Sequence, residues 1–492
     1  MISMAFCMNS NKSTKEGVYM ESFSTYLSQS KPLLQKLIQM LSAKYTYVSI
    51  LACDSVGKFI EVSEKEQKII DHPLQERGFV VRVYNGKYYS EYSFNHLETG
   101  NIKDIFNQIV EQLDVKDAID KSIYLKETNY PLIQEQAMKE SFSKLNKDKK
   151  YTLQELIHFC KKMVDHTFEE SEYVIHSSCR IEYLTISKMF LSSKKELEQV
   201  YFWANGRLSV ILNRNDITKT NFESASDVTI TGVLKELDKK AHGLIKDGRA
   251  LLDSEKPSAG EYDIITTPDI TGIIAHEAFG HGVEMDMFVK NRAKAQQYLG
   301  KRVASEIINM HDGAIPFENS SSYFFDDEGI LAQDTLIIKN GILQTGIADT
   351  LSALKLNITP TGNGKRESYK RKAYTRMTTT YFERGKSNLD DMIATIKKGI
   401  LVSNAYSGME DPKNWGMQAI ALIGKEIVDG KVTSKVFSPI YMSGNVLDIL
   451  QSASLTSHDF ELFGSGYCCK GYKEKVKTVD GGPYLKVKVN IG

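Results

Sequence analysis

The chain is organised around one stretch, Thr267-Pro-Asp-Ile-Thr-Gly-Ile-Ile-Ala-His-Glu-Ala-Phe-Gly-His-Gly-Val-Glu284. Its first three residues are typical of a helix start, because proline fits the first turn and an acidic side chain stabilises the positive end of the helix. A helix that begins there places His276 and Glu277 well inside it and His281 at its end. Two imidazoles and a carboxylate so close together make a candidate metal site.

The spacing of the two histidines is unusual for a zinc-binding helix. The zincin signature places its histidines four residues apart, with a glutamate between them as general base, whereas His276 and His281 are five apart. Five residues turn a side chain by about 140° on an ideal helix, so both imidazoles face one ion only if the helix breaks or widens. Gly280 and Gly282 favour a break, because glycine accepts backbone angles that end a helix. A surface helix end with two unrelated histidines is the alternative, and the spacing leaves both open.

Composition restricts the class of protein. The 492 residues include 62 basic and 62 acidic side chains, so no net charge draws the chain to nucleic acid or to an anionic membrane. The length predicts about two or three domains. No apolar run approaches the roughly 18 residues of a membrane span, no signal peptide is recognisable, and six cysteines are too few for a disulfide framework. We expect a cytoplasmic protein that binds neither nucleic acid nor membrane.

The first half of the chain predicts an α+β domain with a largely antiparallel sheet. A flexible N-terminus, 1–19, precedes this domain, which is expected over 20–253. Turn signals within it are Asp54 to Gly57, Asn85-Gly86 and Asn205-Gly206. The predicted helices are Ser22–Ser42, Ile102–Leu113, Thr152–Asp165 and Val228–Leu252. The predicted strands are Tyr45–Cys53, Gly57–Ser63, Gly78–Tyr84, Lys87–Ser93, Tyr173–Ile175, Cys179–Phe190 and Gln199–Val210.

The second half predicts a mainly-β domain that carries the histidine helix. Pro257 and Gly260 mark the boundary, and the domain is expected over 254–492. Asn340-Gly341 and Asp429-Gly430 predict two hairpins. The predicted strands are Tyr262–Thr266, Thr335–Lys339, Ile342–Ile347, Ala419–Val428, Lys431–Phe437 and Tyr484–Asn490. The predicted fold class is therefore α+β with two domains.

A catalytic zinc site needs a third protein ligand and an open position for water. The residues themselves leave three candidates for that ligand. Glu284 follows the second histidine closely, Asp326-Asp-Glu-Gly329 is a carboxylate cluster, and Cys468 or Cys469 lies in a loop flanked by glycines. An acidic run of this kind is more often a turn, and adjacent cysteines are usually one buried and one exposed side chain. Spacing does not choose between the candidates.

Five motifs in the region 260–492 together resemble the TldD/PmbA family of metallopeptidases, and the N-terminal half resembles it less sharply. Their order and spacing over more than 200 residues are far more specific than any single motif. The motifs are His276-Glu-Ala-Phe-Gly-His-Gly-Val-Glu284, which is similar to an HExxxH signature; Asp326-Asp-Glu-Gly329 with Ala332-Gln333; Arg376-Met-Thr-Thr-Thr-Tyr381; Ser443-Gly-Asn-Val446; and Gly466-Tyr-Cys-Cys-Lys-Gly471 followed by Asp480-Gly-Gly482.

The resemblance implies a zinc peptidase with one Zn²⁺ per catalytic chain. In it His276 and His281 bind the metal, a cysteine of the C-terminal loop is the third ligand, and Glu277 is the general base. The family pattern places Cys468 in the ligand position, whereas Cys469 stands where the family has a glycine. The substrates implied are small peptides or unfolded segments, bound as an added strand along a sheet edge. The partner implied is a second copy or a paralogue that lacks the metal motif.

Three further residues are weaker candidates for substrate binding. Arg376 either binds a substrate carboxylate in a bidentate manner or forms a salt bridge with Asp326 or Asp327. Tyr381 and Asn445 are either hydrogen-bond donors near the cleft or parts of the core and of a turn. An alternative function is a non-catalytic peptide-binding or maturation subunit, for which a broken metal motif is expected. An enzyme with a cysteine nucleophile is a third alternative, and no arrangement of residues in the sequence supports it.

Overall fold

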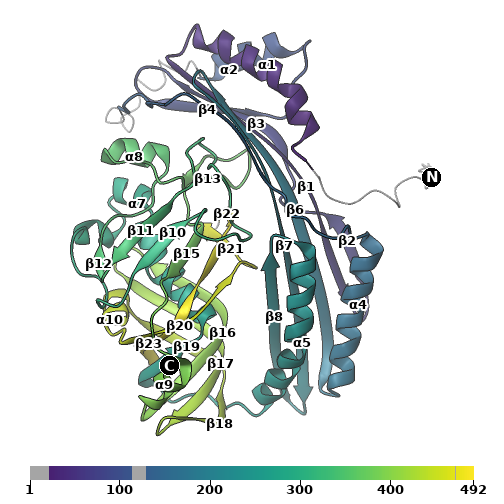
Figure 1. Cartoon of the computed structure of the whole chain (residues 1–492), viewed down its shortest axis with the longest axis vertical. Coiled ribbons are helices and arrows are strands. Elements are labelled where there is room, and N and C mark those ends of the chain that lie inside the picture. The colour runs from purple at the N-terminus through teal and green to yellow at the C-terminus, as the bar shows by residue number, and fades with distance from the viewer. Residues whose placement is uncertain (1–21, 114–128, 471–472) are drawn as a thin grey trace, which may run out of the picture.

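The computed structural model describes residues 22–113, 129–470 and 473–492, so the predicted flexible N-terminus, 1–19, lies outside the described residues. Two large sheets dominate, one of eight strands and one of eleven. Figure 1 shows the first sheet as a long curved layer with α4 and α5 on one face, and the second sheet as a more compact body beside its other face. The predicted α+β class is confirmed, with the C-terminal half mainly β.

The eight-stranded sheet is antiparallel except for one edge, where β5 runs parallel to β7. Its strand order is β4-β3-β1-β6-β7-β5, with β2 added on β1 and β8 on β7. The strands are β1 (Tyr47–Ser63), β2 (Gln67–Asp71), β3 (Arg77–Tyr84), β4 (Tyr89–Phe94), β5 (Met138–Lys144), β6 (Val174–Ser192), β7 (Lys195–Arg214) and β8 (Ile217–Asp227).

Four helices of the N-terminal half bury their apolar faces on this sheet. One apolar cluster joins the first two helices to β1 and β3, and a second joins the last two to β6, β7 and β8. Thr152 caps its helix as predicted and forms a reciprocal capping box with Glu155. The helices are α1 (Thr25–Ser42), α2 (Ile102–Leu113), α4 (Leu153–Glu170) and α5 (Ile230–Leu252).

Two predicted turns in this sheet are wrong, and so is the predicted gap between Tyr173–Ile175 and Cys179–Phe190. The chain runs straight through Gly57 in the 17-residue β1, through Gly206 in β7, and without a break along β6. A Cβ atom on Gly57 would lie 1.9 Å from the carbonyl oxygen of Tyr183 on β6, and one on Gly206 would lie 2.4 Å from a methyl group of Leu237 on α5. These glycines permit close packing inside strands rather than chain reversal.

The eleven-stranded sheet has the order β12-β11-β10-β15-β23-β19-β17-β16-β9, with β18 added on β17 and β20 on β23. β9 also pairs with β23, so β9, β16, β17, β19 and β23 close into a ring. The strands are β9 (Gly260–Thr266), β10 (Met310–Gly313), β11 (Asp334–Lys339), β12 (Ile342–Leu343), β15 (Thr379–Phe382), β16 (Lys398–Asp411), β17 (Gly416–Val428), β18 (Lys431–Phe437), β19 (Ile440–Asn445), β20 (Leu455–Phe463) and β23 (Val479–Ile491).

Two small sheets complete the strand structure. They are β13 (Gly364–Lys365) with β14 (Tyr374–Thr375), and β21 (Tyr467–Lys470) with β22 (Lys473–Lys477). The predicted hairpins at Asn340-Gly341 and Asp429-Gly430 are both present. All four of these turn residues have φ between 47° and 75°, which is the backbone that the Asn-Gly and Asp-Gly signals predict.

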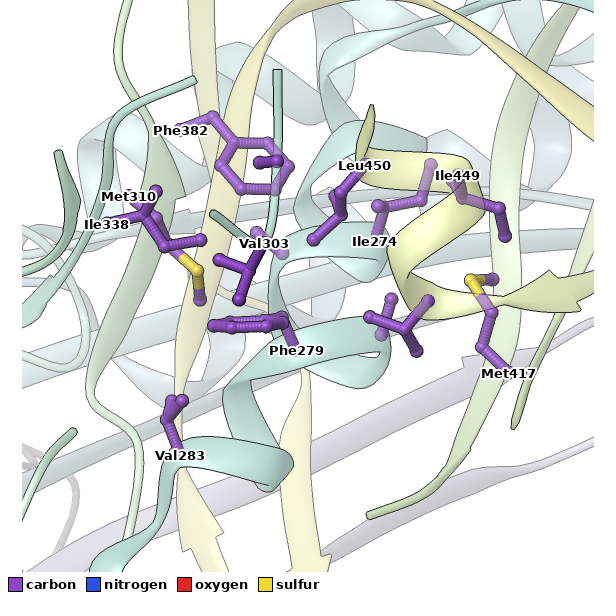
Figure 2. Packing of buried hydrophobic residues seen from close by; sticks show 14 of the residues in the cluster. Ile274, Phe279, Val283, Val303, Met310, Ile338, Phe382, Met417, Ile449 and Leu450 are labelled. Atoms are coloured by element: carbon purple, nitrogen blue, oxygen red, sulfur yellow. The ribbon is translucent and has the colours of Figure 1, made fainter. Parts of the chain in front are cut away.

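The helical elements of the C-terminal half are short. Among all described helices, none combines the length and the apolar character needed to span a lipid bilayer. The segment from 268 to 283 is largely buried, and Figure 2 shows Ile274, Phe279 and Val283 of this segment in the apolar core with Val303 and Leu450. The elements are α6 (Pro268–Ile273), η1 (Ile274–Gly280), η2 (His281–Val283), α7 (Met285–Val289), η3 (Lys294–Tyr298), α8 (Thr350–Leu356), α9 (Leu389–Ala394) and α10 (Val446–Gln451).

Candidate metal centre

The two histidines lie on a segment that changes its helix type twice. The chain is α-helical to Ile273, forms a π-helix over Ile274–Gly280, and then forms a 3₁₀ turn over His281–Val283. The amide of His281 donates to the carbonyl of His276, five residues earlier, so the two residues are one turn apart. Their ring centroids lie 5.3 Å apart, with the ring planes at 85°. The helix therefore widens, as the spacing of the histidines requires.

The two glycines of the segment provide space rather than special backbone angles. Gly280 has φ of −59° and ψ of −48°, so the prediction that its backbone freedom ends the helix is wrong. A Cβ atom on Gly280 would lie 2.2 Å from the sulfur of Met377, and one on Gly282 would lie 2.7 Å from Oε1 of Glu410. The segment needs glycine because neighbouring side chains occupy the volume that a methyl group would fill.

A thiol from the other end of the domain meets the imidazoles. The Sγ atom of Cys468, on β21, lies 3.4 Å from Nε2 of His281, which is 187 residues away in the chain. One donor atom each from His276, His281 and Cys468 all lie within 4.8 Å of one another. Cys468 is buried, whereas Cys469 is exposed and lines the adjacent cavity. Of the two adjacent cysteines, Cys468 is therefore the one placed beside the histidines.

The protonation chemistry of this cluster suits a divalent cation. Burial alone would raise the pKa of the Cys468 thiol, but the imidazoles of His276 and His281 lower that pKa well below its ordinary value. Burial lowers the pKa of His276, but the neighbouring thiolate raises it to about 9. Without a metal ion, shared protons balance the thiolate. Two imidazoles and a thiolate are donors that zinc prefers, and a zinc ion would take the place of these protons.

Glu284 lies behind His281 rather than among the three donors. Its Oε2 atom accepts from Nδ1 of His281 at 3.2 Å and from Nζ of Lys470 at 3.0 Å. Its Oε1 atom lies 3.6 Å from Nε of Arg376. A carboxylate bound to the far nitrogen of a metal-binding histidine fixes the orientation of the ring. Asp480 lies near the other imidazole but does not hydrogen-bond to it: its Oδ2 atom is 3.8 Å from Nδ1 of His276, a buried nitrogen without a hydrogen-bond partner among the described residues.

The acidic cluster at 326–328 lies apart from the metal centre and contacts the N-terminal half. Asp327 pairs with Lys188 of β6, and Oε1 of Glu328 lies 2.6 Å from the guanidinium of Arg82 of β3. Arg376 is fully buried and does not line the cavity. The alternative that Arg376 pairs with this cluster is wrong, because the ion pair of Arg376 is with Glu284.

The other two candidate substrate residues have structural contacts. The ring of Tyr381 is stacked on His311, with centroids 5.1 Å apart and planes at 12°. The side chain of Asn445 accepts a hydrogen bond from the amide of Leu447 at 3.0 Å and caps α10. Neither Tyr381 nor Asn445 lines the cavity. In the structure Tyr381 packs against His311 and Asn445 caps a helix, and substrate contact by either residue stays a prediction.

A cavity of about 850 Å³ opens beside the metal centre between the two sheets. Glu277 projects into it, and its Oε2 atom lies 3.8 Å from Nε2 of His281. Burial raises the pKa of Glu277, while the two histidines lower it. Residues of both halves line the cavity, among them Arg207, Phe222, Glu223 and Lys240 from the N-terminal half and Asn404 to Glu410 from β16.

The wall formed by β16 is an open strand edge. β16 pairs with β9 only as far as Val402, whereas its pairing with β17 continues to Asp411. Within the part of the chain that the structure describes, residues 403–411 therefore have a neighbouring strand on one side only. A Cβ atom on Gly408 would lie 2.5 Å from Cγ of Glu277, so this edge passes directly beside the carboxylate. The sequence prediction missed β16, although the apolar run Gly399-Ile-Leu-Val402 is a strand signal.

Comparisons with known proteins find relatives in sequence for the C-terminal half and in fold for both halves. Residues 259–489 match the family model described as the PmbA/TldA metallopeptidase C-terminal domain. A metalloprotease of Methanothermobacter thermautotrophicus is 32% identical over 238 residues, which are 48% of this chain and 51% of that protein. A zinc metalloprotease TldD homolog of Saccharolobus solfataricus is 31% identical over 281 residues, 57% of this chain and 60% of that protein. The matched region spans little more than half the length of these relatives.

Solved structures show the same fold over both halves. TldE from Thermococcus kodakarensis has a TM-score of 0.72 at 17% identity and covers 93% of this chain and 99% of its own. A Thermotoga maritima protein described as a candidate modulator of a DNA gyrase has a TM-score of 0.74 at 16% identity, over 94% of this chain and 100% of its own. At these identities the likeness concerns the fold. Similarity in sequence to the PmbA/TldA metallopeptidases is therefore shown for residues 259–489, and the rest of the chain shares the fold alone.

Proposed function

We propose that the protein is a zinc-dependent peptidase that cleaves small peptides or unfolded segments held in an extended conformation. The observation that carries the proposal is the meeting of two imidazoles and one thiolate, with donor atoms within 4.8 Å, beside a cavity into which Glu277 projects. Relatives that match the C-terminal half are named metalloproteases, and one of them is named a zinc metalloprotease. His276, His281 and Cys468 would hold one zinc ion per catalytic chain.

The roles of the protein groups follow from their positions. Zinc held by such donors supplies Lewis acidity, which lowers the pKa of water toward about 7 and polarises a peptide carbonyl. The carboxylate of Glu277, 3.8 Å from Nε2 of His281, would accept a proton from the attacking water and pass it to the leaving amine. Glu284 would hold the ring of His281 in its binding orientation through the hydrogen bond to Nδ1.

The open edge of β16 supports binding of an extended peptide. A peptide that adds as a strand along residues 403–411 would hydrogen-bond through its main chain, which accepts many sequences. Gly408 leaves room for the carboxylate of Glu277 at this edge, so the added strand would pass beside the general base. We also propose a dimer, with a second copy or with a paralogue, since the chain shares its fold with a TldE.

The decisive experiment is Glu277→Gln in the zinc-loaded protein. Products from an unbiased peptide library, identified by mass spectrometry, would show cleavage by the wild type and a loss of about 100-fold or more in the variant, the usual contribution of a general base. Metal analysis should find about one zinc per chain in both proteins, because Glu277 is not among the three donors. Full activity in Glu277→Gln would contradict the mechanism. Peptide binding without cleavage by the wild type would favour a peptide-binding subunit instead.

A further inference from the structure

The cavity contains a buried carboxylate that has no ion-pair partner among the described residues. Glu410 lies near the end of β16 and lines the cavity. Both of its carboxylate oxygens are buried, and neither joins an ion pair or accepts a well-aligned hydrogen bond from any residue that the structure describes, although the nearby backbone amide of Gly282 lowers its pKa. Nε1 of Trp415, in the turn that follows, is also buried without a partner. Leaving such atoms unpaired is costly, so a buried unpaired carboxylate that faces a cavity points to a ligand that completes it.

The other charged groups of the cavity are already engaged. Nζ of Lys470 lies 3.0 Å from Glu284 and 2.5 Å from Asp286. Lys240 lies 3.5 Å from Glu236 and 4.0 Å from Glu223. The guanidinium of Arg207 lies over the ring of Phe222, 3.8 Å from its centroid. Each cation that lines the cavity therefore has a contact of its own away from Glu410.

Glu410, on β16, lies near the candidate general base, Glu277. A Cβ atom on Gly282 would lie 2.7 Å from Oε1 of Glu410. The carboxylate of Glu410 is therefore next to the turn that carries His281. Glu410 is two residues beyond Gly408, which packs against Glu277, and alternate residues of a strand point to the same face. Two residues of strand span about 7 Å. A peptide bound along β16 would therefore bring a group about two residues from the cleaved bond to Glu410.

We propose that Glu410 binds a positively charged group of the substrate, either the N-terminal ammonium or a lysine or arginine side chain, and so selects cationic peptides. This inference rests on the proposed peptide-binding role of the cavity. The ammonium or guanidinium group would donate hydrogen bonds to the two free carboxylate oxygens and supply the missing positive charge. Without such a ligand, burial raises the pKa of Glu410 well above its ordinary value, although His281 lowers it.

Binding of three matched peptides tests the inference. All measurements use the full chain, zinc-loaded, with Glu277→Gln to prevent cleavage. One peptide has a free N-terminus and no basic side chain, the second is N-acetylated with one lysine, and the third is N-acetylated with norleucine in place of the lysine. Fluorescence anisotropy should show one or both cationic peptides binding about 10- to 100-fold more tightly than the neutral one, the range of a hydrogen bond to a charged group. Comparing the affinities of the first two peptides shows whether Glu410 binds the terminal ammonium or the lysine side chain.

Adding Glu410→Gln should abolish this preference. Glu223→Gln is the matched control, because it removes a carboxylate from the same cavity at a site that already has Lys240 at 4.0 Å, and it should keep the preference. Equal affinities for the three peptides, or a preference that survives Glu410→Gln, would overturn the inference. Equal binding together with cleavage by the wild type would leave the proposed peptidase intact. Selective binding without cleavage would support Glu410 and contradict the peptidase.

Discussion

The candidate metal centre joins two regions that are held in different ways. The histidine segment lies in the core of the C-terminal half, where Ile274, Phe279 and Val283 have no exposed surface. The cysteine lies on the small hairpin formed by β21 and β22, outside the eleven-stranded sheet. This hairpin contacts the N-terminal sheet: the hydroxyl of Tyr467 donates to Oε1 of Glu182 at 3.1 Å, and Nζ of Lys477 lies over the ring of Trp203, 4.7 Å from its centroid.

This difference shows that the two kinds of donor depend on different parts of the fold. The imidazoles are placed by local structure, a π-helix packed among apolar side chains. The thiol is placed by contacts between the two halves of the chain. We therefore expect the N-terminal sheet, although it supplies no donor, to affect metal affinity. Substitutions on the helix should change stability, whereas substitutions at the anchor of the hairpin should change metal binding.

The largest effect is expected from removing the thiol. Cys468→Ser should lower zinc affinity by more than about 100-fold, because loss of an outer partner of a metal ligand alone costs about 10- to 100-fold. Cys469→Ser is the matched control, because Cys469 is adjacent but exposed, and it should retain the affinity of the wild type. Competition with a chelating dye measures both. An equal loss in the two variants, or a greater loss in Cys469→Ser, would contradict the assignment of the hairpin donor.

The next effect concerns the histidine segment. Gly280→Ala should lower the free energy of unfolding by about 1–3 kcal/mol, because the added methyl group would lie 2.2 Å from the sulfur of the buried Met377. Gly243→Ala is the control, since a methyl group on this glycine of α5 would meet no atom within 4 Å. That change should stabilise the protein by about 0.4–1 kcal/mol. Urea unfolding of the zinc-free proteins measures both changes.

A double-mutant cycle identifies the cause of the Gly280 effect. Met377→Ala removes the sulfur, so Gly280→Ala should cost less in that background than in the wild type. The expected coupling is about 0.5–3 kcal/mol, the usual range for residues in contact. Additive costs would show that the methyl group is not excluded by Met377, and the volume explanation for this glycine would then be wrong.

The sequence predicted the features that depend on short stretches of chain. The Asn85-Gly86, Asn340-Gly341 and Asp429-Gly430 hairpins are all present, and in the last two both turn residues adopt the left-handed angles that tight turns need. The helix cap at Thr152 was equally local. The histidine spacing required a helix that either breaks or widens between the two residues, and the structure contains a widened one. Each of these signals lies within a few residues of the structure that it predicts.

Features set by distant contacts could not be predicted in this way. Gly57 and Gly206 resemble turn residues in sequence, yet each faces a neighbouring element that leaves no room for a side chain. Glu410 was missed because nothing in its own stretch shows that its carboxylate is buried without a partner. The residues alone left the choice among Glu284, the acidic cluster and the cysteines open. The placement of Cys468 beside the histidines depends on contacts across 187 residues.

The smallest predicted effect tests the anchor of the hairpin. Tyr467→Phe removes one hydroxyl that donates to Glu182, at a cost of about 1 kcal/mol, so zinc affinity should fall about five-fold while the fold is retained. Glu182 keeps its hydrogen bond from Asn205 at 2.8 Å, which limits the damage to the N-terminal sheet. The control Tyr262→Phe removes a hydroxyl on β9 that donates to the carbonyl of Ser258, just before that strand, and it should not change the affinity. If both variants bind zinc as the wild type does, the hairpin holds its thiol without help from the N-terminal sheet. Similar losses in the two variants would show an effect of any lost hydroxyl rather than of this anchor.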